Sequence, residues 1–457
     1  MERFVFHGYC VRLTNSISKT IVVDTLHTQT MSAIVNNSDS CTRREFVVAT
    51  GLLFAGTTIS CSSNNEQKPT TEHPVEHNIL ALPDDSPVIR VRVGKIRGRN
   101  NVSIGETQVT RSNDKWYTSG NRPIHRRTAN AIVFDSVTNC KVTEGNTVKE
   151  ISGTVELFSR NDLSSYAFDV VATIPIELYL PGVLAGELYS HWHPATFAAQ
   201  AIAARSYAVA HHLQRVEVSH YDVSDDESSQ MFLGEVSLDV AHRAVRETEG
   251  IVLSWNKTVV PAYYSACCGG TAARAIDAIS GSNQHNILPL FGHDGIDACT
   301  TLDIHTWTAR RDSRTLRKQL NACSTLLKLP ELITIHSIRS VEPSATNAHG
   351  RPTRLAIVDR RRRVTEMRAR DFVRAVQTPI SSMPNPTEKI WSSFLTGKKS
   401  GLDIQFEGYG MGHGVGLCQY GAQEFAGRGK SFEEILSWYY PQATLHTIPT
   451  ITTHTMA

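Results

Sequence analysis

The sequence predicts an α+β fold in which a β-rich part precedes helical segments. Residues 88–93 alternate apolar and polar side chains, which is the pattern of a half-buried strand. Residues 153–157 and 168–171 add two further strand-like runs. An alanine-rich stretch at residues 195–213 then has helical periodicity. Strands that come before the helices favour an α+β fold.

Two helices are predicted from their ends as well as from their periodicity. Pro194 opens the first at a position where proline is favoured, since the missing N–H has no partner there anyway. Side chains recur at helical spacing along it, at Phe197, Ala201, Ala204 and Ala208. Near the carboxyl end, Ser431 and Glu434 have the spacing of a capping box, and Pro441 stops the helix that they open.

Between the two helices lie further strand-like pieces, at residues 250–253 and 355–358. The run Arg360–Arg363 follows the second piece. A short run of like charges is usually a solvated hairpin tip, and this reading is preferred here to an anion-binding site. The chain shows no internal repeat.

Composition limits the class of protein without naming a partner. The chain has 457 residues, 40% of them hydrophobic and 20% charged, which is enough for two or three globular units or one large one. With a formal net charge of +2, the chain has no large excess of basic residues. Nucleic acid is therefore not an expected partner.

The first 61 residues read as an export signal. Arg43 and Arg44 precede an apolar run, Val47–Ile59, as in a twin-arginine signal. The run has about 13 residues, whereas a transmembrane helix needs about 20. Cys61 follows it where a lipoprotein cysteine stands, which gives a membrane-anchored lipoprotein as one expected form. Met31 is an alternative translation start.

Residues 62–84 are Ser, Asn, Gln, Pro, Thr and Glu with little to bury, so they are predicted to form a flexible linker. The folded domain is expected at residues 85–447, followed by a tail at residues 448–457. An exported protein of this design is expected in the periplasm or cell envelope.

Glu187 is the strongest candidate for chemistry. If the chain is helical after Pro181, Leu184 and Glu187 are neighbours on one face, close to Trp192. An apolar setting raises the pKa of a carboxyl group and suits a general acid. Taken alone, a glutamate in a helix is more often a solvated surface residue, so the argument depends on the segments that accompany it.

The alanine-rich helix carries three of those accompanying residues. Gln200 and Tyr207 are seven positions apart and point the same way, while Arg205 lies about 140° round the helix from Gln200. Small residues between them allow close packing. The alternative reading is an ordinary core helix with a polar flank.

A glycine-rich segment, residues 408–422, contains His413 and Gln419. Alternating glycines indicate unusual backbone dihedral angles or a close approach to a neighbour. The segment has neither a strand-to-helix nucleotide motif nor a P-loop lysine. A carbohydrate-binding or catalytic cleft fits it better than a nucleotide site.

These segments together resemble the SpoIID/LytB family, which comprises stage II sporulation protein D and amidase enhancers. Five stretches carry the resemblance, in the family's order: Val183–Glu187, Ala199–Tyr207, Tyr264–Thr271, Gly412–Ala422 and Ile435–Pro441. The resemblance extends over most of the chain after the linker. It implies a single elaborated catalytic domain at residues 85–447 with a central cleft. Gly186 before the acid and Cys418, where relatives often carry serine, depart from the pattern.

The resemblance implies a lytic transglycosylase, a carbon–oxygen lyase acting on peptidoglycan glycan strands that lack stem peptides. One carboxyl group, Glu187, would serve as acid and then as base while an anhydromuramyl end forms. Hydrolysis instead normally needs two carboxyl groups about 5 to 9.5 Å apart. The sequence offers no clear second partner, although Glu177 is left open. The alternative function is a non-catalytic enhancer that binds wall glycan and stimulates an N-acetylmuramoyl-L-alanine amidase.

The resemblance also implies substrate-side roles for Gln200, Arg205, Tyr207, His413 and Gln419. Gln200 and Arg205 would position Glu187 or bind sugar, and His413 and Gln419 would line the opposite wall. No cofactor is required by this chemistry. Sporulation itself is not implied, because such domains also occur outside it.

The resemblance also gives a candidate metal set, because some relatives hold zinc near the glycine pair Gly269 and Gly270. The set consists of Cys267, Cys268, His293 and Cys299. Adjacent cysteines are not the Cys-x-x-Cys spacing of a strong zinc motif. Three alternatives stay open at this point: structural zinc, a Cys268–Cys299 disulfide in an oxidising exterior, and free thiols.

Overall fold

The computed structural model describes residues 20–22, 32–34, 80–119, 125–128, 131–134, 140–381, 383 and 388–449. The chain divides into two compact units, one of residues 5–77 and one of residues 1–4 and 78–457. In the first, β1 (Thr20–Val22) and β2 (Ser32–Ile34) pair antiparallel. The predicted export signal, with Cys61 and Met31, lies otherwise outside the described residues. Among those described, no helix is both long and apolar enough to cross a membrane.

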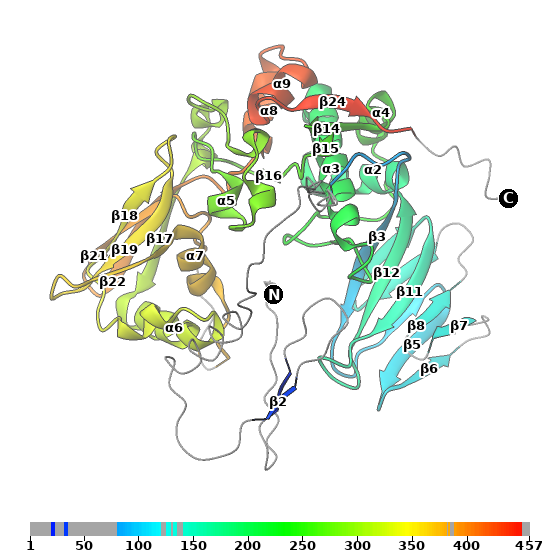
Figure 1. Ribbon diagram of the computed structural model, residues 1–457, viewed down its shortest axis with the longest axis horizontal. Coiled ribbons are helices and arrows are strands. Elements are labelled where there is room, and N and C mark those ends of the chain that lie inside the picture. The colour runs from blue at the N-terminus through cyan, green and yellow to red at the C-terminus, as the bar shows by residue number, and fades with distance from the viewer. Residues whose placement is uncertain are drawn as a thin grey trace, which may run out of the picture. The chain divides into compact units, whose positions relative to one another are not determined.

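The larger unit begins with two antiparallel β-sheets, seen in blue and cyan in Figure 1. One has the strand order β13 (Val223–Ser224), β3 (Val88–Ile96), β12 (Phe168–Pro175), β11 (Thr154–Ser159), β8 (Ala131–Phe134), β7 (His125–Thr128), with only β13 parallel to its neighbour. The other has the order β10 (Thr147–Ile151), β9 (Cys140–Glu144), β4 (Val102–Ile104), β5 (Thr107–Ser112), β6 (Lys115–Ser119). The predicted strands at residues 88–93, 153–157 and 168–171 are all confirmed.

Helices pack beside the first sheet and on one another. They are α2 (Ile176–Glu187), α3 (Pro194–Arg215), α4 (Asp239–Glu247), α8 (Gln419–Gly427) and α9 (Phe432–Tyr439). The helices α2 and α3 contact the sheet, and α4, α8 and α9 pack on α3. Pro194 opens α3 as predicted, and the Ser431 capping box opens α9. The helix that carries Glu187 starts earlier than expected, because Pro181 lies inside α2. Proline there forfeits one backbone hydrogen bond in the second turn of the helix, and the packing of the buried face of α2 outweighs that loss.

Short strands join these helices to the glycine-rich segment. One small sheet has the order β15 (Thr258–Val259), β14 (Ile251–Trp255), β24 (Thr444–Thr447), and β16 (Tyr264–Ser265) pairs parallel with β23 (Leu417–Cys418). Gly416 takes φ +65°, and a side chain there would collide with the backbone oxygen of Tyr263. Glycine is therefore required for β23 to approach β16.

A third sheet, absent from the sequence prediction apart from one strand, occupies residues 306–409. Its order is β17 (Thr306–Asp312), β22 (Asp403–Tyr409), β21 (Leu395–Ser400), β18 (Ser340–Thr346), β19 (Pro352–Val358), β20 (Val364–Arg368). Figure 1 shows α6 (Ser313–Leu326) and α7 (Ala369–Gln377) beside it. Arg360–Arg363 form the exposed tip of the β19–β20 hairpin, as predicted.

Two hydrophobic cores hold the larger unit together. One lies under the first two sheets and the helices above them, and the other lies between the third sheet and its helices, with Phe372 of α7 packed against Phe406 of β22. The remaining helical pieces are α5 (Ala275–Ala278) and the 3₁₀ turns Asn283–His285, Leu288–Leu290, Ala298–Thr301, Asp303–His305 and Pro330–Thr334. Ala275 and Leu290 belong to the first core, and Leu332 belongs to the second. The fold is α+β, as the sequence predicts. Leu80, which lies inside the predicted linker, is buried.

Candidate active site

Glu187 is the last residue of α2, and its side chain is half-buried. The chain turns extended at Leu188, which ends the helix there. A carboxylate at a helix carboxyl terminus meets the negative end of the helix dipole, which disfavours its ionised form. The position thus makes Glu187 easier to protonate while leaving it in reach of solvent.

Three donors from three separate segments hold the Glu187 carboxyl group. The backbone N–H of Met231 donates to Oε1 at 2.8 Å, and the Tyr264 hydroxyl donates to the same oxygen at 3.3 Å. The Gln419 amide donates to Oε2 at 3.2 Å. Because both oxygens are held, the carboxyl plane has a fixed orientation, as a proton-transfer group requires.

The pKa of Glu187 is raised above its usual range, chiefly because burial disfavours the charged form. The neighbouring charge of Glu227 raises it further. The hydrogen bonds from Met231, Gln419 and Tyr264 act in the opposite direction, because they favour the carboxylate. A carboxyl group balanced in this way can both give and accept a proton.

Buried polar groups position Tyr264. The Tyr179 hydroxyl donates to the Gln230 amide oxygen at 3.1 Å, and the Gln230 amide nitrogen donates to the Tyr264 hydroxyl oxygen, also at 3.1 Å. The same nitrogen reaches the backbone oxygen of Ala204 at 3.2 Å. This chain connects α3 to the hydroxyl that contacts Glu187.

Aromatic rings flank the acid. Trp192 packs edge-on against Tyr420 with ring centroids 5.1 Å apart, and Tyr189 lies 5.4 Å from Trp192. Tyr189 is 56% exposed, so this aromatic group has a face toward solvent. Rings of this kind offer apolar surface with a polar edge, which suits a sugar ring better than a charged group.

Two residues expected to position Glu187 make no hydrogen bond to it among the described residues. Arg205 is buried and forms a two-pronged ion pair with Glu177, at 2.8 and 2.7 Å. Glu177 and Glu187 are ten residues apart in α2, about 15 Å along the helix axis, so they do not form a hydrolytic carboxyl pair. Gln200 is fully buried, and neither polar atom of its amide has a hydrogen-bond partner among the described residues.

Tyr207 and His413 lie close to the site without touching Glu187. The Tyr207 hydroxyl is 3.5 Å from that of Ser229, and its ring packs against Tyr264 at 6.3 Å. His413 is half-buried, and its Nδ1 accepts the backbone N–H of Val415 at 3.0 Å. Burial, assisted by the Arg351 charge, lowers the pKa of His413 to about 4. Its imidazole is therefore neutral, with the proton on Nε2.

A compact sulfur cluster lies next to the glycine-rich segment. The ligand atoms of Cys268, Asp297, Cys299 and Cys418 all lie within 4.8 Å of one another, and all four residues are buried. The sulfurs of Cys268 and Cys299 are 3.7 Å apart and are not bonded to each other. Of the predicted metal set, the structure places Cys268 and Cys299 in this group, and the Cys267 side chain also contacts Cys299.

This cluster differs in membership from the predicted metal set. Cys267 is not one of these four residues, although its side chain contacts Cys299 and Cys418, and His293 lies 3.7 Å from Asp297. Tetrahedral zinc with sulfur ligands at about 2.3 Å places those sulfurs about 3.8 Å apart. The spacing of Cys268 and Cys299 fits such a site.

Sequence reasoning missed several of the residues that complete the site. Met231 acts through its backbone and so leaves no signature in the sequence. Tyr264 stands inside the motif Tyr264–Thr271, and that motif was the signal by which it could have been found. Glu227 influences Glu187 through space alone.

Residues 164–255 match the model of a family described as stage II sporulation protein. Homologous proteins in Bacillus subtilis include an amidase enhancer, 25% identical over 58% of this chain, and stage II sporulation protein D, 24% identical over 59%. Over this segment the chain is similar to the SpoIID/LytB family. An uncharacterised protein of Brachyspira hyodysenteriae is 29% identical to this chain over 59% of it.

The alignments cover 66% of the Brachyspira protein, 40% of the amidase enhancer and 74% of the sporulation protein. This chain thus spans less than two thirds of the first two relatives. Residues 271–416 match a domain of unknown function, DUF8618. That second match contains the whole third sheet and its separate core.

Proposed function

We propose that this chain is a lytic transglycosylase that cleaves peptidoglycan glycan strands lacking stem peptides. The observation that carries the proposal is the Glu187 carboxyl group, with a raised pKa and three hydrogen-bond donors from separate segments. The family similarity and the names of the relatives support a role in the cell wall.

The reaction uses Glu187 twice. The protonated carboxyl group gives its proton to the glycosidic oxygen, and the bond from that oxygen to C1 of the muramic acid breaks. The resulting carboxylate then takes the proton of the same sugar's 6-hydroxyl as that oxygen bonds to C1. The products are an anhydromuramyl end and a strand with a free hydroxyl, and Glu187 regains its proton.

The neighbours of Glu187 serve the two halves of this cycle differently. Burial and the Glu227 charge favour the acid form that starts the reaction. Donation from Met231 and Gln419 stabilises the carboxylate that exists between the two proton transfers. A single carboxyl group suffices because the attacking oxygen belongs to the substrate. The pairing of Glu177 with Arg205, away from Glu187, is consistent with this scheme.

The test is digestion of stem-peptide-free glycan strands by the mature protein, with products read by mass spectrometry. We expect anhydromuramyl ends from the unaltered protein and from Glu247→Gln, a matched change at an exposed glutamate of α4. Glu187→Gln should give none. Hydrolytic ends, or cleavage by Glu187→Gln, would refute the mechanism.

A second candidate is an enhancer that binds glycan and stimulates an amidase, favoured by the relative that bears that name. Binding of strands without cleavage, together with faster release of stem peptides by an added amidase, would establish it. The same digestion therefore separates the two functions.

The proposal places the protein outside the cytoplasm, in the cell envelope. It is supported by the predicted signal at residues 1–61, with lipidation of Cys61 as the route to an anchor, and by the cell-wall relatives. The cluster of Cys268, Asp297, Cys299 and Cys418 would hold a structural zinc ion. That ion supplies no step of the glycan chemistry; it ties the loop after β16 to β23.

A further inference from the structure

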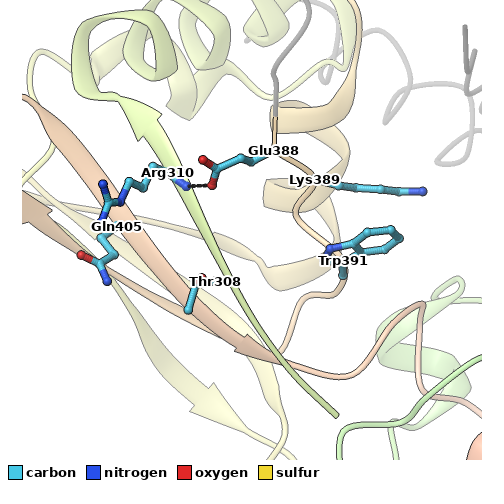
Figure 2. A pocket seen from close by; sticks show the side chains of 6 residues that line it. All are labelled: Thr308, Arg310, Glu388, Lys389, Trp391 and Gln405. Atoms are coloured by element: carbon cyan, nitrogen blue, oxygen red, sulfur yellow. Dashed lines mark hydrogen bonds between the residues drawn. The ribbon is translucent and has the colours of Figure 1, made fainter. Parts of the chain in front are cut away.

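A second surface with chemistry of its own lies on the third sheet. A pocket of about 500 Å³ opens over the outer face of β17 and β22, where the segment from residue 388 to 391 passes alongside them (Figure 2). It is lined by Thr308, Arg310, Glu388, Lys389, Trp391 and Gln405. It lies within the matched domain of unknown function, and none of its lining residues is among the three donors to Glu187.

Trp391 forms an aromatic wall of this pocket. Its side chain is 40% exposed, and the Lys389 ammonium lies 4.6 Å from the centre of its ring. Its backbone is fixed, since its carbonyl accepts the N–H of Gly412 at 2.9 Å. The next residue, Ser392, donates its hydroxyl to the backbone of Tyr409 at 2.6 Å. An exposed ring on a fixed backbone is preorganised to stack on a flat ligand.

The other lining side chains are polar and come from paired strands. Arg310 lies directly opposite Gln405 in the β17–β22 register. The backbone N–H of Arg310 donates to Glu388 at 2.6 Å, and Figure 2 shows that this contact leaves the guanidinium pointing away from the carboxylate. No carboxylate of the described residues forms an ion pair with the guanidinium of Arg310. It is available for an anionic group of a ligand.

The pocket is connected to the surroundings of Glu187. Lys389 lies 3.8 Å from Glu227, whose charge raises the pKa of Glu187. Glu227 and Met231, which donates to Glu187, belong to the same loop. Gly412 connects the Trp391 backbone to the glycine-rich segment that supplies Gln419. An extended ligand that reaches Glu187 could therefore continue into this pocket.

We infer that this pocket is a remote subsite for the same glycan strand, binding a muramic acid unit away from the scissile bond. The sugar ring stacks on Trp391, its hydroxyl and amide groups bond to Thr308 and Gln405, and its lactyl carboxylate pairs with Arg310. The inference rests on the glycan substrate proposed above. It gives the matched domain of unknown function, residues 271–416, a role in selecting long strands whose lactyl groups are free of peptide.

The test measures binding by calorimetry in a Glu187→Gln background, which prevents turnover. The probes are a peptide-free disaccharide and a peptide-free octasaccharide from the wall, and a chitin octasaccharide, which lacks the lactyl groups. We expect the wall octasaccharide to bind about tenfold more weakly after Trp391→Ala or Arg310→Ala, the loss of roughly one good contact. Disaccharide binding should be unchanged, and Arg310→Ala should leave binding of the chitin octasaccharide unchanged.

Two controls keep the result specific. Arg314→Ala, at an exposed arginine of α6 outside the pocket, should bind all probes normally. Trp391→Phe should restore most of the affinity, which a folding defect would not allow. Equal octasaccharide affinity in all variants would overturn the inference, as would an equal loss for the disaccharide. Length-dependent binding without any cleavage by the unaltered protein would refute only the transglycosylase, and the subsite would stand.

Discussion

Gln419 donates a hydrogen bond to Glu187 across 232 positions of sequence, with 3.2 Å between Nε2 and Oε2. Gln419 is the first residue of α8, and Glu187 is the last residue of α2. The contact thus joins the start of one helix to the end of another. It unites two of the sequence motifs that carry the family resemblance.

Gln419→Ala should raise the pKa of Glu187, because the lost donor stabilised the carboxylate rather than the acid. The reaction starts from the acid form, so the alkaline limb of the pH profile of kcat/KM should move to higher pH, by on the order of one unit. Gln108→Ala, at an exposed glutamine of β5, should leave the profile in place. A shift to lower pH would contradict the assigned role.

Glu227→Gln should have the opposite effect. Removing the like charge lowers the pKa of Glu187, because the carboxylate no longer faces a second anion. The alkaline limb should move to lower pH. The difference between the variant and the unaltered protein should shrink at high salt, since salt screens the interaction between the two carboxylates. An unchanged limb at low ionic strength would mean that Glu227 does not act on Glu187.

Arg205→Met should destabilise the fold without direct loss of a substrate contact. The change leaves Glu177 without its partner in a largely buried pair, which costs about 3 kcal/mol in the free energy of unfolding. Urea denaturation measures this loss. Lys430→Met breaks the exposed pair with Glu434 and should cost less than about 1 kcal/mol. Equal costs for both changes would show that the Arg205 pair is not structural.

Gly414→Ala should be strongly destabilising, because φ is +72° and the new side chain would lie 2.5 Å from the Arg351 guanidinium. We expect a loss above about 2 kcal/mol in the free energy of unfolding. Gly429→Ala has a similar φ of +83° but meets nothing within 4 Å, so its cost should be about 1 kcal/mol. The difference between the two isolates the contact with Arg351.

Protein purified under reducing conditions should contain about one zinc ion per chain if the sulfur cluster binds metal. Cys299→Ser and Cys418→Ser should lower both the zinc content and the melting temperature. Cys323→Ser, at a buried cysteine in the other core, should keep the zinc. Metal-free protein with a mapped Cys268–Cys299 disulfide would establish the oxidised alternative instead.

The sequence by itself determined the elements whose signals are local. Pro194 and the alanine spacing determined α3, and the Ser431 capping box determined α9. The alternation of apolar and polar side chains identified β3, and the motif around Glu187 identified the candidate acid. Each of these follows from interactions between residues a few positions apart, which a sequence displays directly.

Only the tertiary structure decided what surrounds the acid and what each polar residue contacts. Arg205 pairs with Glu177 rather than Glu187, Cys418 joins Cys268 and Cys299, and Trp391 is exposed over the third sheet. Periodicity says which face of an element is buried but not which distant element covers it. Partners are chosen by the packing of segments remote in sequence, since a buried charge or polar group must find its neighbour there.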